Sequence, residues 1–112
     1  MKIEQRLDGN VSIITILEDI DAGNAGEFRD FLTSRLDAGD TTLLLDFSAV
    51  KFMDSSGIGA IVQQYQSLKP KGGRIAFAGC SDALQRVFEI VGMARLFPMF
   101  PTVEAALQGL KK

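Results

Sequence analysis

The chain has 112 residues, of which 46% are hydrophobic and 23% charged, which is enough for one domain with a packed core and too little for two. Twelve basic and fourteen acidic residues give a formal net charge of −2, without the basic excess that is typical of nucleic-acid-binding domains. Histidine is absent, which excludes a Ser–His–Asp triad, a histidine general base and histidine metal ligands.

The sequence also lacks the features of export or membrane insertion. Its first ten residues, MKIEQRLDGN, are polar, and no apolar run reaches the roughly 20 residues that span a bilayer. No polybasic run indicates an anionic membrane surface, so we expect a cytoplasmic protein without a membrane partner. The single cysteine, Cys80, cannot form an internal disulfide, and we expect a buried, inert thiol.

The first predicted elements are two strands that form a hairpin. IEQRL (residues 3–7) and VSIITILE (residues 11–18) flank the turn DGN, and Asp-Gly tolerates the positive φ that short hairpins need. The second strand is almost entirely β-branched or aliphatic, which is typical of a strand covered on both faces. Further apolar runs predict strands at TTLLLDF (residues 41–47) and RIAFAG (residues 74–79).

Helices are predicted where apolar residues recur at helical spacing. The four stripes are Ala25, Phe28, Phe31, Leu32 and Leu36; Ile58, Ile61, Val62, Tyr65 and Leu68; Leu84, Val87, Phe88 and Val91; and Val103, Ala106, Leu107 and Leu110. Gly39 ends the first helix, and Pro70 with the following glycines ends the second. Ser81 or Asp82 can cap the third helix and Thr102 the fourth.

The resulting order is β β α β α β α β α, where the last strand is a short, weak edge segment within residues 94–100 because Pro98 lacks an N–H donor. Strands that alternate with helices predict right-handed parallel crossovers. We therefore predict a single α/β domain with a mixed, mostly parallel sheet of four to five strands. It has an N-terminal antiparallel hairpin and about four helices packed on the sheet.

The segment KFMDSSGIGA (residues 51–60) joins the third strand to the second helix. Asp54 or Ser55 can cap that helix, an interaction worth about 1 kcal/mol. Capping alone does not explain Gly57 and Gly59, since each glycine costs up to about 1 kcal/mol relative to alanine inside a helix. If this segment is only a helix cap, the two glycines are present because they allow the helix to pack closely on the sheet.

Three chemical functions of this segment can be weighed against its residues. SSGIG is not the G-x-S-x-G motif of a serine nucleophile, and no histidine is present to activate the serine. A phosphate or nucleotide cradle at the helix N-terminus is physically reasonable, but GIG matches neither a dinucleotide fingerprint nor a P-loop. A receiver domain would use the acids of EDID (residues 18–21) for Mg²⁺, but the fourth strand ends without the lysine that such a domain needs.

The second helix carries no charge between Ser55 and Leu68. The face opposite its apolar stripe is uncharged, which favours contact with another protein, although packing under a neighbouring loop would have the same pattern. Its residues are Gly57, Ala60, Gln63, Gln64 and Ser67. A phosphoryl group on Ser55 would bring roughly −1.5 to −2 charges into this surface, and Asp21 is expected at the same end of the sheet.

The segment FMDSSGIGAIV (residues 52–62) resembles the signature of the anti-sigma factor antagonists, stand-alone bacterial proteins built from a STAS domain. The resemblance extends to EDIDAGNAGEF (residues 18–28), to the strand before the signature, and to residues 72–100, including FEIVGMARLF. It therefore spans nearly the whole chain, and it implies that residues 1–112 form a single STAS domain.

The resemblance implies a regulatory function without catalysis. In such proteins the serine after the aspartate, here Ser55, is phosphorylated by the anti-sigma factor, an ATP-dependent serine kinase, and a phosphatase reverses the modification. The unphosphorylated protein binds the anti-sigma factor and thereby releases the sigma factor. The nucleotide belongs to the kinase, so no cofactor, metal or catalytic residue is implied here. The expected partner-binding residues are Asp21, Asn24, Asp54, Ser56, Gly57, Ile58, Gly59 and Gln63.

Two positions depart from the family pattern. The family often has glycine before the acidic loop, where this chain has Glu18, and threonine three positions after the aspartate, where this chain has Asn24. The alternatives are therefore a STAS domain of another system, such as a stress-signalling scaffold or a lipid-transport accessory subunit, or a small α/β domain that binds a nucleotide or another small ligand.

Overall fold

Five strands form one mixed sheet in the computed structural model, which describes residues 1–111. The strands are β1 (Ile3–Asp8), β2 (Val11–Ile16), β3 (Thr42–Asp46), β4 (Arg74–Ala78) and β5 (Met99–Phe100), and they lie side by side in this order. The β1–β2 hairpin is antiparallel, whereas β2, β3, β4 and β5 are parallel. The predicted mixed, mostly parallel sheet with an N-terminal hairpin is confirmed.

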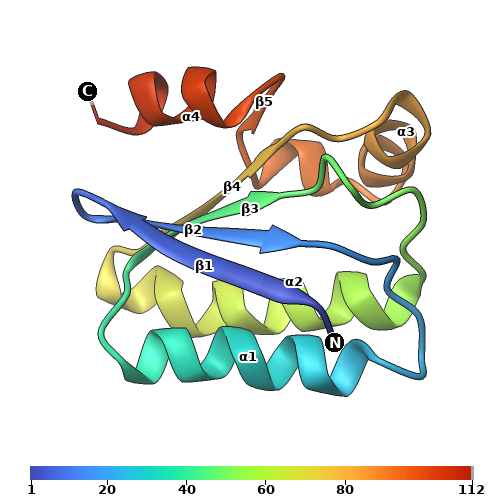
Figure 1. Cartoon of the computed structure of the whole chain (residues 1–112), viewed down its shortest axis with the longest axis horizontal. Coiled ribbons are helices and arrows are strands. Elements are labelled where there is room, and N and C mark those ends of the chain that lie inside the picture. Colours follow the sequence, from blue (N-terminus) through green and yellow to red (C-terminus); the bar gives the residue numbers. More distant parts are fainter. Residues whose placement is uncertain (112) are drawn as a thin grey trace.

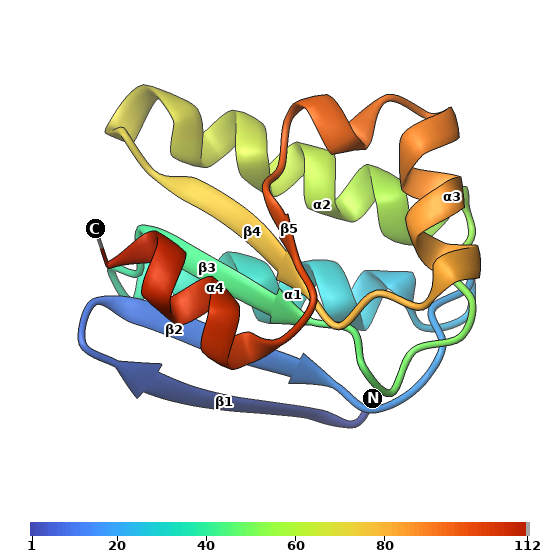
Figure 2. The ribbon, with the colours of Figure 1, turned by 90° about the horizontal axis from the view of Figure 1, so that it is seen from above.

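Helices cover both faces of this sheet. They are α1 (Ala25–Asp37), α2 (Ser55–Leu68), α3 (Asp82–Ile90) and α4 (Val103–Leu110), with short 3₁₀ turns η1 (Lys69–Lys71) and η2 (Met93–Arg95). In Figure 1, α1 and α2 lie side by side beneath the sheet and α4 lies above it. The view from above in Figure 2 has α4 in front of the strands and α1 behind them.

The central strands β3 and β4 are buried on both sides because helices cover both faces of the sheet there. In β3, Leu43 and Leu45 belong to the large core under α1, α2 and α3, while Leu44 belongs to the smaller core under α4. All three leucines are fully buried. This arrangement explains the continuous apolar run in β3, since a strand with one face in solvent would alternate apolar and polar residues.

The ends of two predicted elements differ from the expectation. The third helix ends at Ile90 because Gly92 adopts a left-handed conformation with φ of 82°, so Val91 is half exposed instead of inside the stripe. In the predicted edge segment only Met99 and Phe100 are paired as a strand, because Met93–Arg95 forms the 3₁₀ turn. Pro98 lacks a donor but still accepts a hydrogen bond at its carbonyl from the Phe77 N–H.

Helix α2 is buried on two sides, which corrects the prediction for its uncharged face. Gly57, Ala60 and Gln64 are buried, because α2 packs against α1 as well as against the sheet. The Gln64 amide donates a hydrogen bond of 2.9 Å to the Thr33 hydroxyl on α1. These three residues are therefore covered by packing within the fold, but a neighbouring helix covers them and not the loop of the alternative, whereas Gln63 and Ser67 remain exposed.

The Cys80 thiol and the lengths of the helices concern two expectations drawn from the composition. Cys80 is half-buried, and burial raises the pKa of its thiol to about 11, so the thiol is protonated at neutral pH. Within residues 1–111, every helix is too short or too polar to cross a bilayer.

The two glycines at the start of α2 are expected to respond oppositely to alanine. A Cβ on Gly57 would lie 2.7 Å from Met53 Cγ and 2.8 Å from Ile20 Cγ2, and both neighbours are buried. A Cβ on Gly59 would meet no atom within 4 Å. Gly57→Ala should therefore lower the free energy of unfolding by about 1–2 kcal/mol, and Gly59→Ala should raise it by about 0.5–1 kcal/mol.

Urea denaturation of the two variants beside the wild type measures both values. Each variant is the matched control for the other, because the same methyl group is added two residues apart in one helix. Equal effects of the two substitutions would contradict this assignment of packing.

Candidate functional site

The site is assembled where two chain segments leave the same edge of the sheet. Because β2 and β3 are parallel, the segment after β2 (residues 17–24) and the segment after β3 (residues 47–54) both start at this edge, on the right in Figure 1. Ile20 pairs with Met53 as an isolated parallel bridge. The Ile20 N–H donates to the Phe52 carbonyl and the Asp54 N–H donates to the Ile20 carbonyl, each at 3.1 Å.

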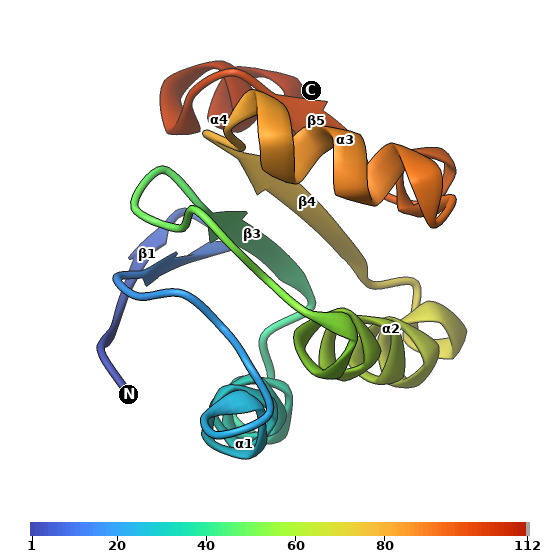
Figure 3. The same cartoon turned by 90° about the vertical axis from the view of Figure 1, so that its right-hand side faces the viewer.

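This pairing brings Asp21 beside the start of α2, as expected from the sequence. Figure 3 looks at this end of the molecule and shows the two segments above the first turns of α1 and α2. The two segments are therefore a continuation of the β2–β3 pairing beyond the regular strands.

Asp19 strengthens the link between the two segments. Its carboxylate oxygen Oδ1 accepts hydrogen bonds from the backbone N–H groups of Lys51, at 2.7 Å, and Phe52, at 3.2 Å. A carboxylate that accepts two backbone donors orients both segments at once. The carboxylate is thus used within the fold, which is unlike the metal-binding acids that a receiver domain requires.

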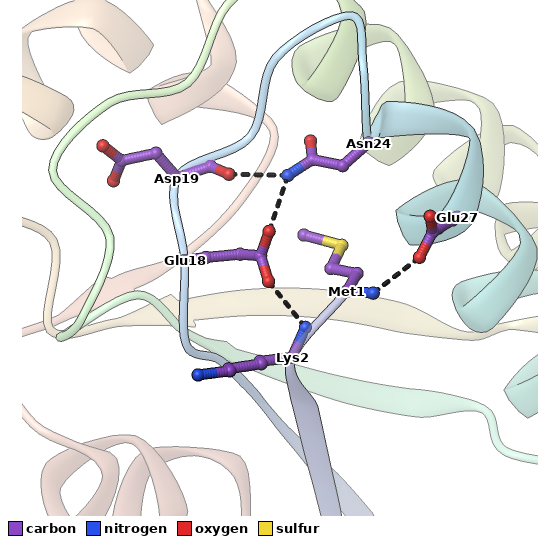
Figure 4. Close-up of polar contacts among 6 residues, drawn as sticks. All are labelled: Met1, Lys2, Glu18, Asp19, Asn24 and Glu27. Carbon is purple, nitrogen blue, oxygen red and sulfur yellow. Dashed lines mark hydrogen bonds and ion pairs between the residues drawn. The ribbon is translucent and has the colours of Figure 1, made fainter.

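Glu18 and Asn24, the two departures from the family pattern, contact each other. The Asn24 amide donates 3.0 Å to Glu18 Oε1 and 2.9 Å to the Asp19 carbonyl, while Glu18 Oε2 accepts the Lys2 N–H at 2.7 Å (Figure 4). The Lys2 N–H, followed by the Asn24 amide, lowers the pKa of Glu18 below its usual value. The Met1 ammonium forms an ion pair of 2.6 Å with Glu27 on α1, which is also drawn in Figure 4.

Asp54 is the N-cap of α2. Its side-chain oxygen accepts the Ser56 N–H at 2.9 Å, and its backbone is extended, as a capping residue requires. Of the two caps considered from the sequence, Asp54 therefore takes the role, and Ser55 is the exposed first residue of the helix. A carboxylate on the N-terminal amides competes with any bound anion, which argues against an anion cradle here.

The predicted partner-binding residues fall into three groups. Asp21, Ser56, Gly59 and Gln63 are exposed, as is the predicted phosphoacceptor Ser55, and Asn24, Asp54 and Ile58 are partly buried. Gly57 is buried beneath them and provides the close approach of α2 to Ile20 and Met53.

An open groove separates the first turns of α1 and α2. Its lining is made almost entirely of small or uncharged side chains, with one arginine: Ala22, Ala25, Gly26, Arg29, Ser56, Gly59, Ala60 and Gln63. The α1 side of this groove was missed by the sequence reasoning. Arg29 lies on the polar side of α1, and only the packing of α1 against α2 makes it line the same groove as Ser56.

The lowered pKa of Glu18 predicts a dependence of stability on pH. Its folded pKa lies below the unfolded value, so its contribution is complete above the usual glutamate pKa and is lost as the pH falls through the folded value. Glu18→Gln should therefore be less stable than the wild type at about pH 7, and this difference should shrink towards about pH 3.

Thermal unfolding of both proteins across that pH range provides the measurement. Glu89→Gln, at an exposed position on α3, controls for the loss of one negative charge. A stability difference for Glu18→Gln that stays constant across the range would contradict the assigned role of the carboxylate.

Comparison with known proteins identifies the family. The model of the STAS domain matches residues 2–106. The anti-sigma-B factor antagonist of Listeria monocytogenes is 28% identical over 109 residues, which cover 97% of this chain and 94% of that protein.

Solved structures have the same fold. An anti-sigma factor antagonist from Mycobacterium paratuberculosis superposes with a TM-score of 0.89 at 22% identity, covering 99% of this chain and 94% of the other. The Bacillus cell fate determinant SpoIIAA in its phosphorylated form gives 0.76 at 22% identity, covering 97% and 99%. Since the family model matches almost the whole sequence, this chain belongs to the STAS domain family.

Proposed function

We propose that this protein is an anti-sigma factor antagonist whose binding is switched by phosphorylation of Ser55. In this proposal the unphosphorylated protein binds an anti-sigma factor that is also a serine kinase, and thereby releases the sigma factor. Phosphorylation breaks the contact and a phosphatase restores it. The proposal is supported by the similarity to the Listeria anti-sigma-B factor antagonist and by the exposed, capped segment that carries Ser55.

The observation that carries the proposal is the exposed glycine in α2. Gly59 lies inside a helix with open space around its Cα, and no positive φ requires glycine there. Glycine at such a position costs about 1 kcal/mol relative to alanine without a return in packing. Local choices that oppose stability are expected at functional sites, and a flat surface without a side chain allows another protein to approach closely.

The surface around Gly59 suits a partner that is sensitive to charge. The exposed residues of α2 are serines, glycine and glutamines, so a partner can cover them without burying an unpaired charge. A phosphoryl group on Ser55 would add roughly −1.5 to −2 charges beside Asp54, and Asp21 is in the adjacent segment. Burying that charge against the partner without a matching positive charge costs a few kcal/mol, which is enough to abolish a micromolar complex.

The switch in this proposal acts on the interface and leaves the fold unchanged. Asp54 continues to cap α2 when Ser55 is modified, because the capping oxygen belongs to Asp54. The helix N-terminus also tolerates an additional negative group next to the cap. Under this proposal the chain contributes a binding surface and a phosphoacceptor, while the partner contributes the nucleotide and the catalysis.

The two adjacent serines allow a matched test. Wild-type protein, Ser55→Ala, Ser55→Asp and Ser56→Ala are used as baits in source-cell lysate, and the retained kinase is purified for affinity and phosphorylation measurements. Ser55→Asp should weaken binding by about 100-fold, since a few kcal/mol separate neutral from charged interfaces. Ser55→Ala should bind but accept no phosphate, and Ser56→Ala should bind and be phosphorylated.

Melting temperatures of all four proteins show whether the variants remain folded. Equal retention of the same partner by wild type and Ser55→Asp, with folding intact, would contradict the switch. Phosphorylation of Ser55→Ala at the wild-type rate would place the phosphoacceptor elsewhere.

A further inference from the structure

We infer that Glu18 and Asn24 are a matched pair of positioning residues, which hold Asp21 in the orientation that the partner meets. The inference deepens the proposed function, because the role of Asp21 at the interface rests on that proposal. Neither Glu18 nor Asn24 needs to touch the partner for this role.

Asn24 uses both ends of its amide on the segment that carries Asp21. Its Oδ1 accepts the Asp21 N–H at 2.9 Å, and its Nδ2 donates to Glu18 and to the Asp19 carbonyl. The backbone completes a tight turn, because the Asp21 carbonyl accepts the N–H groups of Asn24, at 3.2 Å, and Ala25, at 2.9 Å. The Asn24 side chain thus fixes the backbone that leads into Asp21, and backbone hydrogen bonds fix the turn that follows it.

Glu18 connects this turn to the sheet. One of its carboxylate oxygens accepts from Asn24 and the other accepts the Lys2 N–H, just before β1. The Leu17 N–H donates to the Lys2 carbonyl at 3.0 Å, so the same residue is held from both sides. An unbroken path of hydrogen bonds therefore runs from the start of β1 through Glu18 and Asn24 to Asp21. Figure 4 shows the part of this path from Lys2 through Glu18 to Asn24.

The path has a functional consequence because Asp21 is exposed. An exposed segment that is disordered before binding loses conformational entropy when the partner orders it, and affinity falls accordingly. The Asp21 carboxylate also accepts the Gly23 N–H at 2.8 Å, which fixes its own direction. The Glu18–Asn24 pair thus orders the carboxylate in advance, on the segment that is paired with the start of α2 through Ile20 and Met53.

Swapping the carboxylate of Glu18 and the amide of Asn24 between the two positions tests whether these residues act as a pair. Asn24→Asp keeps the oxygen that accepts the Asp21 N–H, but it replaces the donor towards Glu18 with a second oxygen. Glu18→Gln in that background supplies a donor, so the hydrogen bond forms in the reverse direction, while the amide oxygen of the introduced glutamine still accepts the Lys2 N–H. The double variant has the same net charge as the wild type.

Amide hydrogen exchange of the free protein is the primary readout. Asn24→Asp should speed exchange at the Asp21 and Gly23 N–H groups by roughly five- to tenfold, which corresponds to about one net hydrogen bond. The double variant should recover a large part of that protection, although the bond to the Asp19 carbonyl is not restored. Asn10→Asp in the hairpin turn controls for charge, and the Leu44 N–H in β3 reports on the sheet.

Affinity for the kinase retained by the wild-type bait is the second readout. This affinity should fall in Asn24→Asp and recover in the double variant, so that the variants rank in affinity as they rank in protection from exchange. Unchanged exchange at Asp21 and Gly23 in Asn24→Asp would overturn the inference, and so would changed and rescued exchange with no effect on affinity. If the wild type retains no kinase, the proposed function fails, and the exchange data alone decide whether the pair positions Asp21.

Discussion

The parallel pairing of β2 with β3 is the constraint on which the site depends. It sends the two following segments out of the same sheet edge, and the bridge between Ile20 and Met53 pairs these segments again beyond the ends of the strands. Asp19 adds two further hydrogen bonds across the same gap. Asp21 and the cap of α2 are therefore adjacent because of sheet register, and a change of that register would separate them.

Helix α2 combines a structural side with an exposed side. Gly57, Ala60 and Gln64 are inside, where small volume or a hydrogen bond to Thr33 is required for close packing of α1, α2 and the sheet. Ser55 and Gly59 are outside, where packing places no demand on them. Gly57 and Gly59, two residues apart in one helix, are therefore glycine for different reasons. Gly57 is explained by packing within the fold, whereas no contact within the fold requires Gly59.

The elements of the fold could be predicted from the sequence because apolar periodicity reports directly on which residues are buried. The sheet order could not, because strand neighbours depend on contacts between distant segments. The sequence places Gln64 and Ala60 on the exposed face, because a helical period identifies one buried stripe and does not show that a second helix covers another side. Glu18 and Asn24 were noted as departures, but their hydrogen bond depends on how the loop folds back.

In the proposed switch, charge on Ser55 changes the surface and leaves the fold intact. Backbone amide chemical shifts of the protein carrying phosphoserine at position 55, compared with those of the unmodified protein, test this directly. The proposed switch predicts shift changes confined to the segment that carries Asp21 and to the first turns of α2, with the amides of β3, β4 and α4 unchanged. Changes that spread through the sheet would show a conformational switch and would contradict a switch that acts on the surface alone.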